Sequence, residues 1–262
     1  MIEVRHLRKS FGRLTALDDL SVRLDAGRAV SLIGPNGSGK TTFLKCLLGL
    51  VVPDGGEICF DGQPVRNGWE YRRHIGYMPQ IGRYPDHLTI RQVFDMVKDL
   101  RKARPADLDE ELLDAFGLPA LFDKTMRSLS GGTRQKVSAC LAFLFDPAVL
   151  ILDEPTAGLD PVAAERLKAK IQREKGRGKL ILLTSHILSD LDELTTEVMY
   201  LQDGKLQFFQ PVEWLKQRTG EEKLGRAIAR LMSGEPLSSP QSDPTALHFT
   251  PVGEHQLTTY DF

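Results

Sequence analysis

Residues Gly34 to Thr42 combine glycines, a lysine and two threonines in a spacing that can hold a phosphate chain. The segment fills every specified position of the phosphate-binding loop pattern. Glycines permit a tight turn whose backbone N–H groups surround an anion, and the helix expected to follow points its positive end at the same group. The lysine would contact the outer phosphates, and the first threonine would place its hydroxyl on Mg²⁺. The segment predicts ATP or GTP binding, with contacts from Gly34, Pro35, Asn36, Gly37, Ser38, Gly39, Lys40, Thr41 and Thr42.

Two carboxylates follow the apolar run from Val149 to Leu152. In an open parallel sheet, ligands bind beyond the carboxyl ends of the strands, which is also where the glycine loop is expected. Asp153 could therefore reach the hydration shell of Mg²⁺. Glu154 would face the γ-phosphate and could polarise the attacking water, which is the general-base role of this chemistry. An acidic loop after a strand is common, so this interpretation depends on the glycine loop.

A third polar strand end is predicted at Leu183 to His186. The imidazole of His186 could form a hydrogen bond with the γ-phosphate or with the attacking water, since its protonation is accessible near neutral pH. A surface histidine that caps the next helix is the alternative.

A second segment suited to an anion is Leu129 to Lys136. The hydroxyl of Ser130 and the amides of Gly131 and Gly132 precede a predicted helix. If this segment lies across the domain from Lys40, it can complete a nucleotide site only by approaching the glycine loop of another copy. That arrangement predicts a two-fold dimer with two ATP molecules between the copies. A glycine N-cap of an ordinary helix is the alternative.

The elements expected to position these residues alternate between strands and helices. Short apolar strands are predicted at Arg28 to Ile33, Val149 to Leu152 and Lys179 to Leu183, with helices at Thr41 to Leu50 and Val162 to Glu174. Such alternation predicts an α/β fold with a parallel sheet covered on both faces.

Other segments add to this core. Residues 1 to about 25 are expected to form two short strands around a loop at residues 10–13. Residues 84–140 have a mostly helical pattern and predict an inserted helical subdomain. We expect one ATP-binding domain over residues 1–218, followed over 219–262 by a short helix and a poorly ordered tail.

The composition disfavours several classes of protein. Lys and Arg number 34 against 35 Asp and Glu, so a generally basic nucleic-acid binder is disfavoured. The sequence shows neither a secretory signal nor the run of ~18 apolar residues that a membrane span needs. A cytoplasmic protein is expected, with any membrane-spanning part on another chain. Cys46, Cys59 and Cys140 are expected to be reduced and packed in the core.

In combination, these motifs resemble the ATP-binding subunits of ABC transporters, over about residues 2–215. The order is that of the family: glycine loop, Gln80 after a short strand, the segment at Ser130, the Asp153-Glu154 pair, Asp160 and then His186. The resemblance implies a P-loop NTPase core with a mostly parallel sheet, an N-terminal antiparallel β subdomain and the inserted helical subdomain. It also implies Mg²⁺ as cofactor.

The resemblance assigns further roles. It implies that Gln80 contacts the metal and links the γ-phosphate to the helical subdomain, and that Lys40, Glu154 and His186 act in hydrolysis. Asp160 would couple the two sites of the dimer. Phe11 stands where the family places an aromatic ring against adenine.

The resemblance also implies partners. These are a second ATP-binding subunit, most simply a second copy of this chain, and a multi-span membrane permease that holds the chain at the inner face of the cell membrane. Residues 81–89 are expected to receive the permease. The segments 155–161 and 185–188 are typical of ATPases that serve exporter-like permeases. More narrowly, 136–147 and 185–195 resemble the ATPase of the transporter for copper-centre maturation of nitrous oxide reductase.

Three other functions remain open at this point. A soluble ABC-type ATPase acting on DNA or ribosomes would carry a long coiled coil or a second such domain, and the sequence shows neither. A nucleotide-dependent scaffold that hydrolyses little ATP is disfavoured by Glu154 and His186. A kinase built on the same loop would need an acceptor pocket that the sequence does not reveal.

Overall fold

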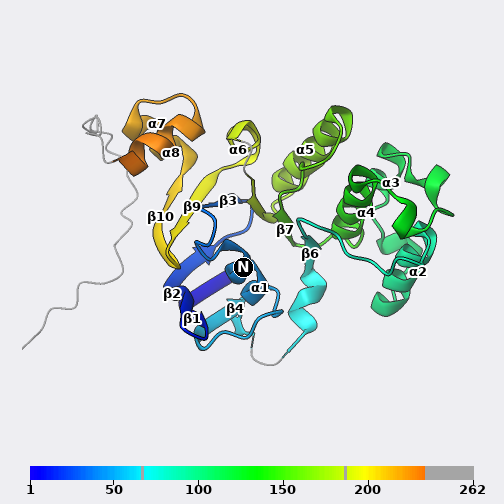
Figure 1. Cartoon of the computed structure of the whole chain (residues 1–262), viewed down its shortest axis with the longest axis horizontal. Helices are drawn as coiled ribbons and strands as arrows, with labels where there is room; N and C mark the ends of the chain where they lie inside the picture. The colour runs from blue at the N-terminus through cyan, green and yellow to red at the C-terminus, as the bar shows by residue number, and fades with distance from the viewer. Residues whose placement is uncertain (66–67, 186–187, 234–262) are drawn as a thin grey trace, which may run out of the picture.

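The computed structural model describes residues 1–65, 68–185 and 188–233 and contains two β-sheets with helices around them (Figure 1). The larger sheet has six strands in the order β10-β9-β3-β8-β7-β6. All neighbours in it are parallel except the β9–β10 pair, so the prediction of a mostly parallel sheet is confirmed. The strands are β3 (Ala29–Ile33), β6 (Ile75–Met78), β7 (Val149–Asp153), β8 (Leu180–Thr184), β9 (Glu197–Gln202) and β10 (Lys205–Pro211).

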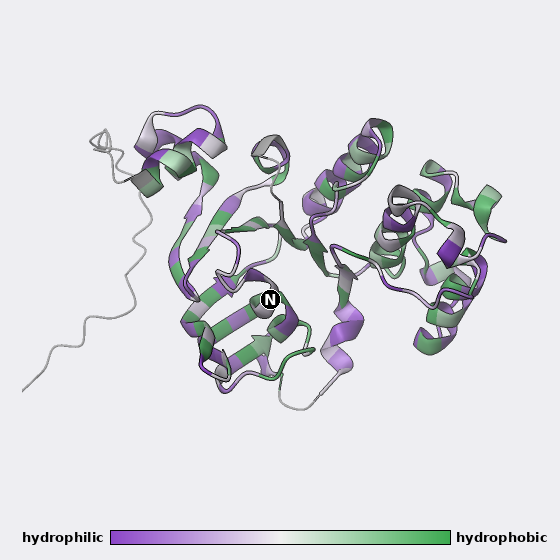
Figure 2. Ribbon diagram, in the orientation of Figure 1, coloured by the Kyte–Doolittle hydropathy of each residue, from purple (hydrophilic) through white to green (hydrophobic). Residues whose placement is uncertain are grey.

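Both faces of this sheet are buried, which explains why its inner strands are continuous apolar runs. Successive side chains of a strand point to opposite faces. In β7, Val149 and Ile151 join the core cluster that contains α1 (Lys40–Leu47), whereas Leu150 and Leu152 join the cluster that contains α5 (Pro161–Gly176). Figure 2 shows these central strands as hydrophobic. The sheet is therefore held rigidly between two cores, with its carboxyl ends free to carry polar residues.

The smaller sheet is antiparallel and has the strand order β2-β1-β4-β5. Its members are β1 (Ile2–Phe11), β2 (Leu14–Leu24), β4 (Gly55–Phe60) and β5 (Gln63–Pro64). The expectation of two short strands is wrong: β1 and β2 have 10 and 11 residues. Register shifts interrupt their pairing, and this explains why the alternation of apolar residues in the sequence is loose.

Helices α2 (Ile90–Arg101), α3 (Glu111–Ala115) and α4 (Gly131–Phe143) are inserted between β6 and β7. We call these helices and their connections the helical lobe; it lies at one end of the molecule (Figure 1). Helix α2 starts with a reciprocal capping box between Thr89 and Gln92. Short 3₁₀ turns join the elements: η1 (Glu70–His74) precedes β6, and η2 (Pro105–Asp107), η3 (Leu118–Leu121) and η4 (Met126–Ser128) lie within the lobe.

Three helices follow α5: α6 (Leu188–Leu194), α7 (Val212–Thr219) and α8 (Leu224–Ser233). Helix α8 buries Leu224, Ala227 and Ile228 in the core that α5 shares. The sequence predicts a short helix around Leu224 to Met232, and α8 spans Leu224–Ser233. The tail expected after it, residues 234–262, lies outside the described residues. None of the helices in the described ranges is both long and apolar enough to cross a lipid bilayer.

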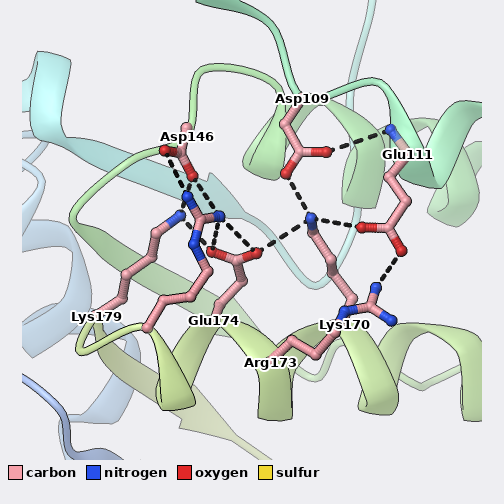
Figure 3. A network of polar contacts seen from close by, with 8 residues as sticks. Asp109, Glu111, Asp146, Lys170, Arg173, Glu174 and Lys179 are labelled. Atoms are coloured by element: carbon pink, nitrogen blue, oxygen red, sulfur yellow. Dashed lines mark hydrogen bonds and ion pairs between the residues drawn. The ribbon is translucent and has the colours of Figure 1, made fainter.

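A network of ion pairs joins the helical lobe to α5 (Figure 3). The ammonium of Lys170 lies 2.5 Å from Asp109, 2.9 Å from Glu111 and 3.1 Å from Glu174. The side chains of Lys170 and Glu174 are only 4% and 2% exposed. Arg173 pairs with Glu111, and Arg177 and Lys179 both pair with Asp146 and Glu174. Four cations and four carboxylates thus balance one another in a network whose centre, at Lys170 and Glu174, is buried.

All three cysteines are buried, so the expectation that they pack in the core is confirmed. Burial raises the pKa of Cys46 to about 11 and raises the pKa of Cys140 well above its usual range. Burial also raises the pKa of Cys59.

Candidate functional site

The glycine loop leads from β3 into α1 and needs glycine at particular positions. Gly34, Gly37 and Gly39 have φ angles of 147°, 82° and 101°, in the region that side chains disfavour. A Cβ atom on Gly34 would lie 2.0 Å from the carbonyl oxygen of Leu201, and one on Gly39 would lie 2.4 Å from that of Ala16. The loop is therefore pressed against β9 and β2, and its turn cannot be made by other residues.

The start of α1 is suited to an anion. Its N-cap is Gly39, which supplies no side-chain cap, and its first turn contains no acidic residue. The amides of the first turn and the helix dipole therefore remain available to a negative group. The hydroxyl of Ser38 is also buried without a hydrogen-bond partner. These features fit a bound phosphate.

Lys40 folds back over the loop. Its ammonium donates hydrogen bonds to the carbonyl oxygens of Gly34 and Pro35, at 2.7 and 2.9 Å. Burial lowers the pKa of Lys40, and the nearby charges of Asp153 and Glu154 oppose that shift. The ammonium is thus held at the loop by two charge-assisted hydrogen bonds to backbone carbonyls.

Two carboxylates stand at the end of β7, as the sequence predicts. Asp153 Oδ1 accepts a hydrogen bond of 2.5 Å from the hydroxyl of Thr184, the facing residue at the end of β8. The amide of Glu154 donates to the same hydroxyl at 3.0 Å and to the carbonyl oxygen of Thr184 at 3.2 Å. Glu154 has a left-handed backbone with a φ of 52°, which is unusual for a residue other than glycine. Thr184 thus fixes both acidic residues.

One cavity of about 300 Å³ brings most of the predicted residues together. It is lined by Phe11, Leu14, Ala16, Asn36, Gly37, Ser38, Gly39, Lys40, Thr41, Thr42, Gln80, Asp153, Glu154 and Thr184. The predicted residues Gly34 and Pro35 line an adjacent cavity with Lys40. His186 lies outside the described residues.

Three lining residues have no role in the sequence prediction: Leu14, Ala16 and Thr184. Phe11 and Leu14 face each other across the β1–β2 hairpin, and their side chains are 51% and 67% exposed. They form an apolar entrance at one end of the cavity. The short hairpin turn at Gly12-Arg13 could have pointed to Leu14, because it brings Leu14 opposite Phe11. Thr184 could have been found only by pairing β7 with β8, which places it opposite Asp153.

The donors in this cavity suit Mg²⁺. Thr41 supplies a hydroxyl, Gln80 an amide oxygen and Asp153 a carboxylate, and all three line the same space. Oxygen donors of this kind, completed by water and phosphate oxygens, are what Mg²⁺ prefers.

The predicted in-trans residues Ser130, Gly131, Gly132 and Asp160 do not line this cavity. They lie together instead: a Cβ atom on Gly132 would lie 2.7 Å from the carbonyl oxygen of Gly158. Ser130 caps α4 by accepting from the amide of Thr133.

Asp160 is linked to the same helix. It caps α5 through the amide of Ala163, at 2.9 Å, and pairs with Lys136 of α4 at 2.6 Å. The hydrogen bond from Lys136 lowers the pKa of Asp160. The two predicted motifs thus form one surface patch at the start of α4 and α5.

A separate, mainly apolar groove of about 270 Å³ lies between the end of α1, β6, α2 and α4. Its lining is Leu48, Leu50, Arg72, Ile75, Gly76, Tyr77, Val97, Arg101, Leu141, Ala142, Phe145 and Pro147. None of residues 81–89 lines it.

Comparison with known proteins identifies relatives of this chain. The family model described as "ABC transporter" matches residues 17–157. Nod factor export ATP-binding protein I of Paraburkholderia xenovorans is 35% identical over 208 residues, covering 78% of this chain and 68% of that protein. The ABC transporter ATP-binding protein YtrB of Bacillus subtilis is 32% identical over 218 residues, covering 83% and 74% of the respective chains.

Solved structures of ABC ATP-binding proteins have a similar fold. One described as the ATP-binding subunit of an ABC transporter has a TM-score of 0.82 and 29% identity, covering 88% of this chain and 99% of that one. A dimeric structure of the ATP-binding cassette MJ0796, bound to ADP and phosphate, has a TM-score of 0.71 and 24% identity, covering 80% and 98%. This second likeness concerns the fold alone.

Proposed function

The chain belongs to the ABC transporter family, as an ATP-binding subunit whose ATP hydrolysis is coupled to transport, and we propose how its residues divide that work. The cavity at the glycine loop supports the proposal, because the loop and the carboxylates of Asp153 and Glu154 line it together. The loop amides and Lys40 would bind the phosphates. Glu154 would orient and polarise the attacking water.

Bound Mg²⁺ would be held by Thr41, Gln80 and Asp153 and would neutralise charge on the phosphate oxygens. Lys40 would exchange its two carbonyl contacts for phosphate oxygens. Phe11 would stack on the adenine ring, since its face lies open at the entrance of the cavity. His186, by resemblance, would contact the γ-phosphate.

The Glu154→Gln variant tests the catalytic assignment. It retains the size and shape of the side chain but replaces the carboxylate base with a neutral amide, so turnover should fall by about 10²–10⁴-fold. ATP affinity should stay near that of the wild type. Normal turnover in a well-folded variant would refute the role of Glu154. Lys40→Ala should instead weaken ATP binding itself.

We further propose that two copies close around two ATP molecules. Ser130, Gly131, Gly132 and Asp160 would complete the site of the other copy, because they form a patch outside the chain's own cavity. ATP should therefore convert the Glu154→Gln variant to a dimer in size-exclusion chromatography with light scattering. Persistence of monomers at saturating ATP would contradict this arrangement.

The partner that we propose for the apolar groove is a membrane permease, which would hold the chain at the cytoplasmic face of the membrane. Leu50 on the groove and Ile81 beside β6 are 61% and 65% exposed, as expected for a surface that another protein covers. Residues 81–89 would contribute to the same contact. Co-purification with the neighbouring gene products tests this. If only soluble chains are recovered under conditions that preserve membrane complexes, the alternative of an ABC-type ATPase without a permease gains support.

We propose that the transporter is exporter-like and serves copper-site maturation of nitrous oxide reductase. The support is the resemblance of segments 136–147 and 185–195. The Nod factor export relatives are also exporters by name. Deleting the gene in the source organism should leave nitrous oxide reductase without its full copper content. Normal copper content in the reductase would refute this role in copper-site maturation and would leave the ATPase assignment unchanged.

A further inference from the structure

We propose that Lys9 and Asp54 are positioning residues that hold the ring of Phe11 ready to receive the nucleotide base. This inference rests on the proposed stacking role of Phe11. Lys9 and Asp54 do not line the nucleotide cavity, and their contribution would be made through Phe11.

The ammonium of Lys9 lies over the ring of Phe11, 5.3 Å from its centroid. That distance is within the range of about 6 Å over which a cation is attracted to an aromatic face. The two residues are two positions apart near the end of β1, where the pairing with β2 is irregular, and the contact itself shows that the two side chains meet. Phe11 as a residue is 51% exposed, which leaves space for a base to stack on its ring.

Lys9 is itself held in place. Its ammonium contacts Asp54 Oδ1 at 2.7 Å, and its side chain is only 16% exposed. The other oxygen, Asp54 Oδ2, accepts from the amide of Ser10 at 2.6 Å, and the amide of Asp54 donates to the carbonyl oxygen of Arg8 at 2.8 Å. Asp54, in the loop before β4, thus contacts three residues near the end of β1 and holds this end of the strand in place.

The consequence concerns base binding. A phenylalanine at the tip of a hairpin would lose side-chain freedom when a base stacks on it, and that loss weakens binding. A fixed cation over the ring removes part of this freedom beforehand. It also draws the ring's electron density, which lowers repulsion with the π-electrons of a stacked base. Phosphate binding should not depend on Lys9.

Lys9→Met tests this with two probes, ATP and inorganic tripolyphosphate, which has the phosphate chain but no base. Affinity for ATP should fall about two- to five-fold, as expected for one exposed cation–π contact. Affinity for tripolyphosphate should not change. Lys9→Arg, which retains a cation, should bind ATP almost as the wild type does, and Asp54→Asn should behave like Lys9→Met.

Phe11→Ala is the reference variant. It should lose about five- to a hundred-fold in ATP affinity, as base stacking on an aromatic ring predicts. In that background Lys9→Met should have no further effect, because the two residues act in series. Thermal unfolding confirms that each variant is folded.

The outcomes separate the two proposals. If Phe11→Ala weakens ATP binding but Lys9→Met does not, the positioning role is wrong and stacking stands. Equal losses for ATP and tripolyphosphate in Lys9→Met would also overturn the positioning role. If Phe11→Ala leaves ATP affinity unchanged, both proposals fail.

Discussion

Glu154 combines a chemical role with an unfavourable backbone conformation. A left-handed φ in a residue other than glycine costs roughly 1–3 kcal/mol and persists only where neighbours enforce it. Here the neighbour is Thr184, whose hydroxyl and carbonyl oxygen both accept from the Glu154 amide. The strained residue is therefore held in place by the adjacent strand.

Thr184→Val should lower turnover without a matching loss of ATP affinity. The substitution keeps the shape of the side chain but removes the hydrogen bonds to Asp153 and to the Glu154 amide. A hydrogen bond to a charged group contributes about 1.5–3 kcal/mol, so kcat should fall about ten- to a hundred-fold. Thr184→Ser keeps the hydroxyl and should remain close to wild type. Equal activity of the valine and serine variants would argue against this role.

Residue-level prediction from the sequence is most specific where the backbone itself makes the candidate site. The glycine loop needs glycine for steric reasons, so its sequence is restrictive, and residues 36–42 of the loop line one cavity. Leu14 and Thr184 went unassigned because an apolar residue in a hairpin and a threonine in a strand have many ordinary explanations. Their roles depend on which strands become neighbours.

At the scale of elements, the ion network in Figure 3 fixes the helical lobe against α5. Lys170 contacts two carboxylates of the lobe and one of α5, so it connects the two parts directly. Asp160, at the other end of α5, pairs with α4. The lobe and α5 are thus joined at separate points along the helix.

Lys170→Met should destabilise the fold by about 3–5 kcal/mol, since it removes the buried cation that Asp109, Glu111 and Glu174 share. Urea unfolding at neutral pH measures this. Arg104→Met, which breaks the exposed pair with Asp107, is the matched control and should change the unfolding free energy far less, because solvent screens an exposed pair. Similar effects of the two substitutions would show that the network does not stabilise the protein in the way its burial suggests.

Acid should weaken the same network. Burial alone would raise the pKa of Glu174, but hydrogen bonds from Lys179 and Lys170 outweigh it and hold the pKa below the usual 4.5. A carboxyl group with a lowered folded-state pKa contributes stability that is complete above its unfolded pKa and is lost as the pH falls through the folded one. Unfolding free energy should therefore decline below about pH 4.5. Glu174→Gln should reduce the steepness of that decline.

The elements predicted from sequence were those with strong periodicity. The apolar strands β3, β7 and β8 and the helices α1 and α5 are present close to the expected ranges. The extents of β1 and β2 were underestimated because register shifts break the period-2 pattern that reveals a strand. Strands β4 and β5 went unpredicted, since their pairing with β1 is a long-range property.

At the scale of the whole molecule, the nucleotide cavity and the apolar groove lie on different parts of the structure. β6 connects them: Ile75 and Tyr77 line the groove, and Gln80, just beyond the strand, lines the nucleotide cavity. A partner seated in the groove would therefore sit a few residues from the nucleotide site. The sequence predicted the nucleotide site but not this groove, because the groove is assembled from several elements that are far apart in the sequence.

Leu50→Asp should abolish co-purification with the permease while ATP hydrolysis by the isolated chain continues. A buried, unpaired carboxylate in the groove opposes an apolar contact. Leu100→Asp is the matched control, because Leu100 is an exposed apolar residue of the helical lobe that does not line the groove. Equal retention of the permease by both variants would remove the groove as the docking site.

The burial of Cys46, Cys59 and Cys140 makes the chain a convenient background for spectroscopic labelling. Maleimides react with thiolates, and burial keeps all three thiols protonated and inaccessible at neutral pH. A single cysteine introduced on an exposed helix would therefore be the one site that takes up a fluorophore or spin label. Dye pairs attached in this way could follow, in real time and without a cysteine-free variant, the distance between two copies as ATP is bound and consumed.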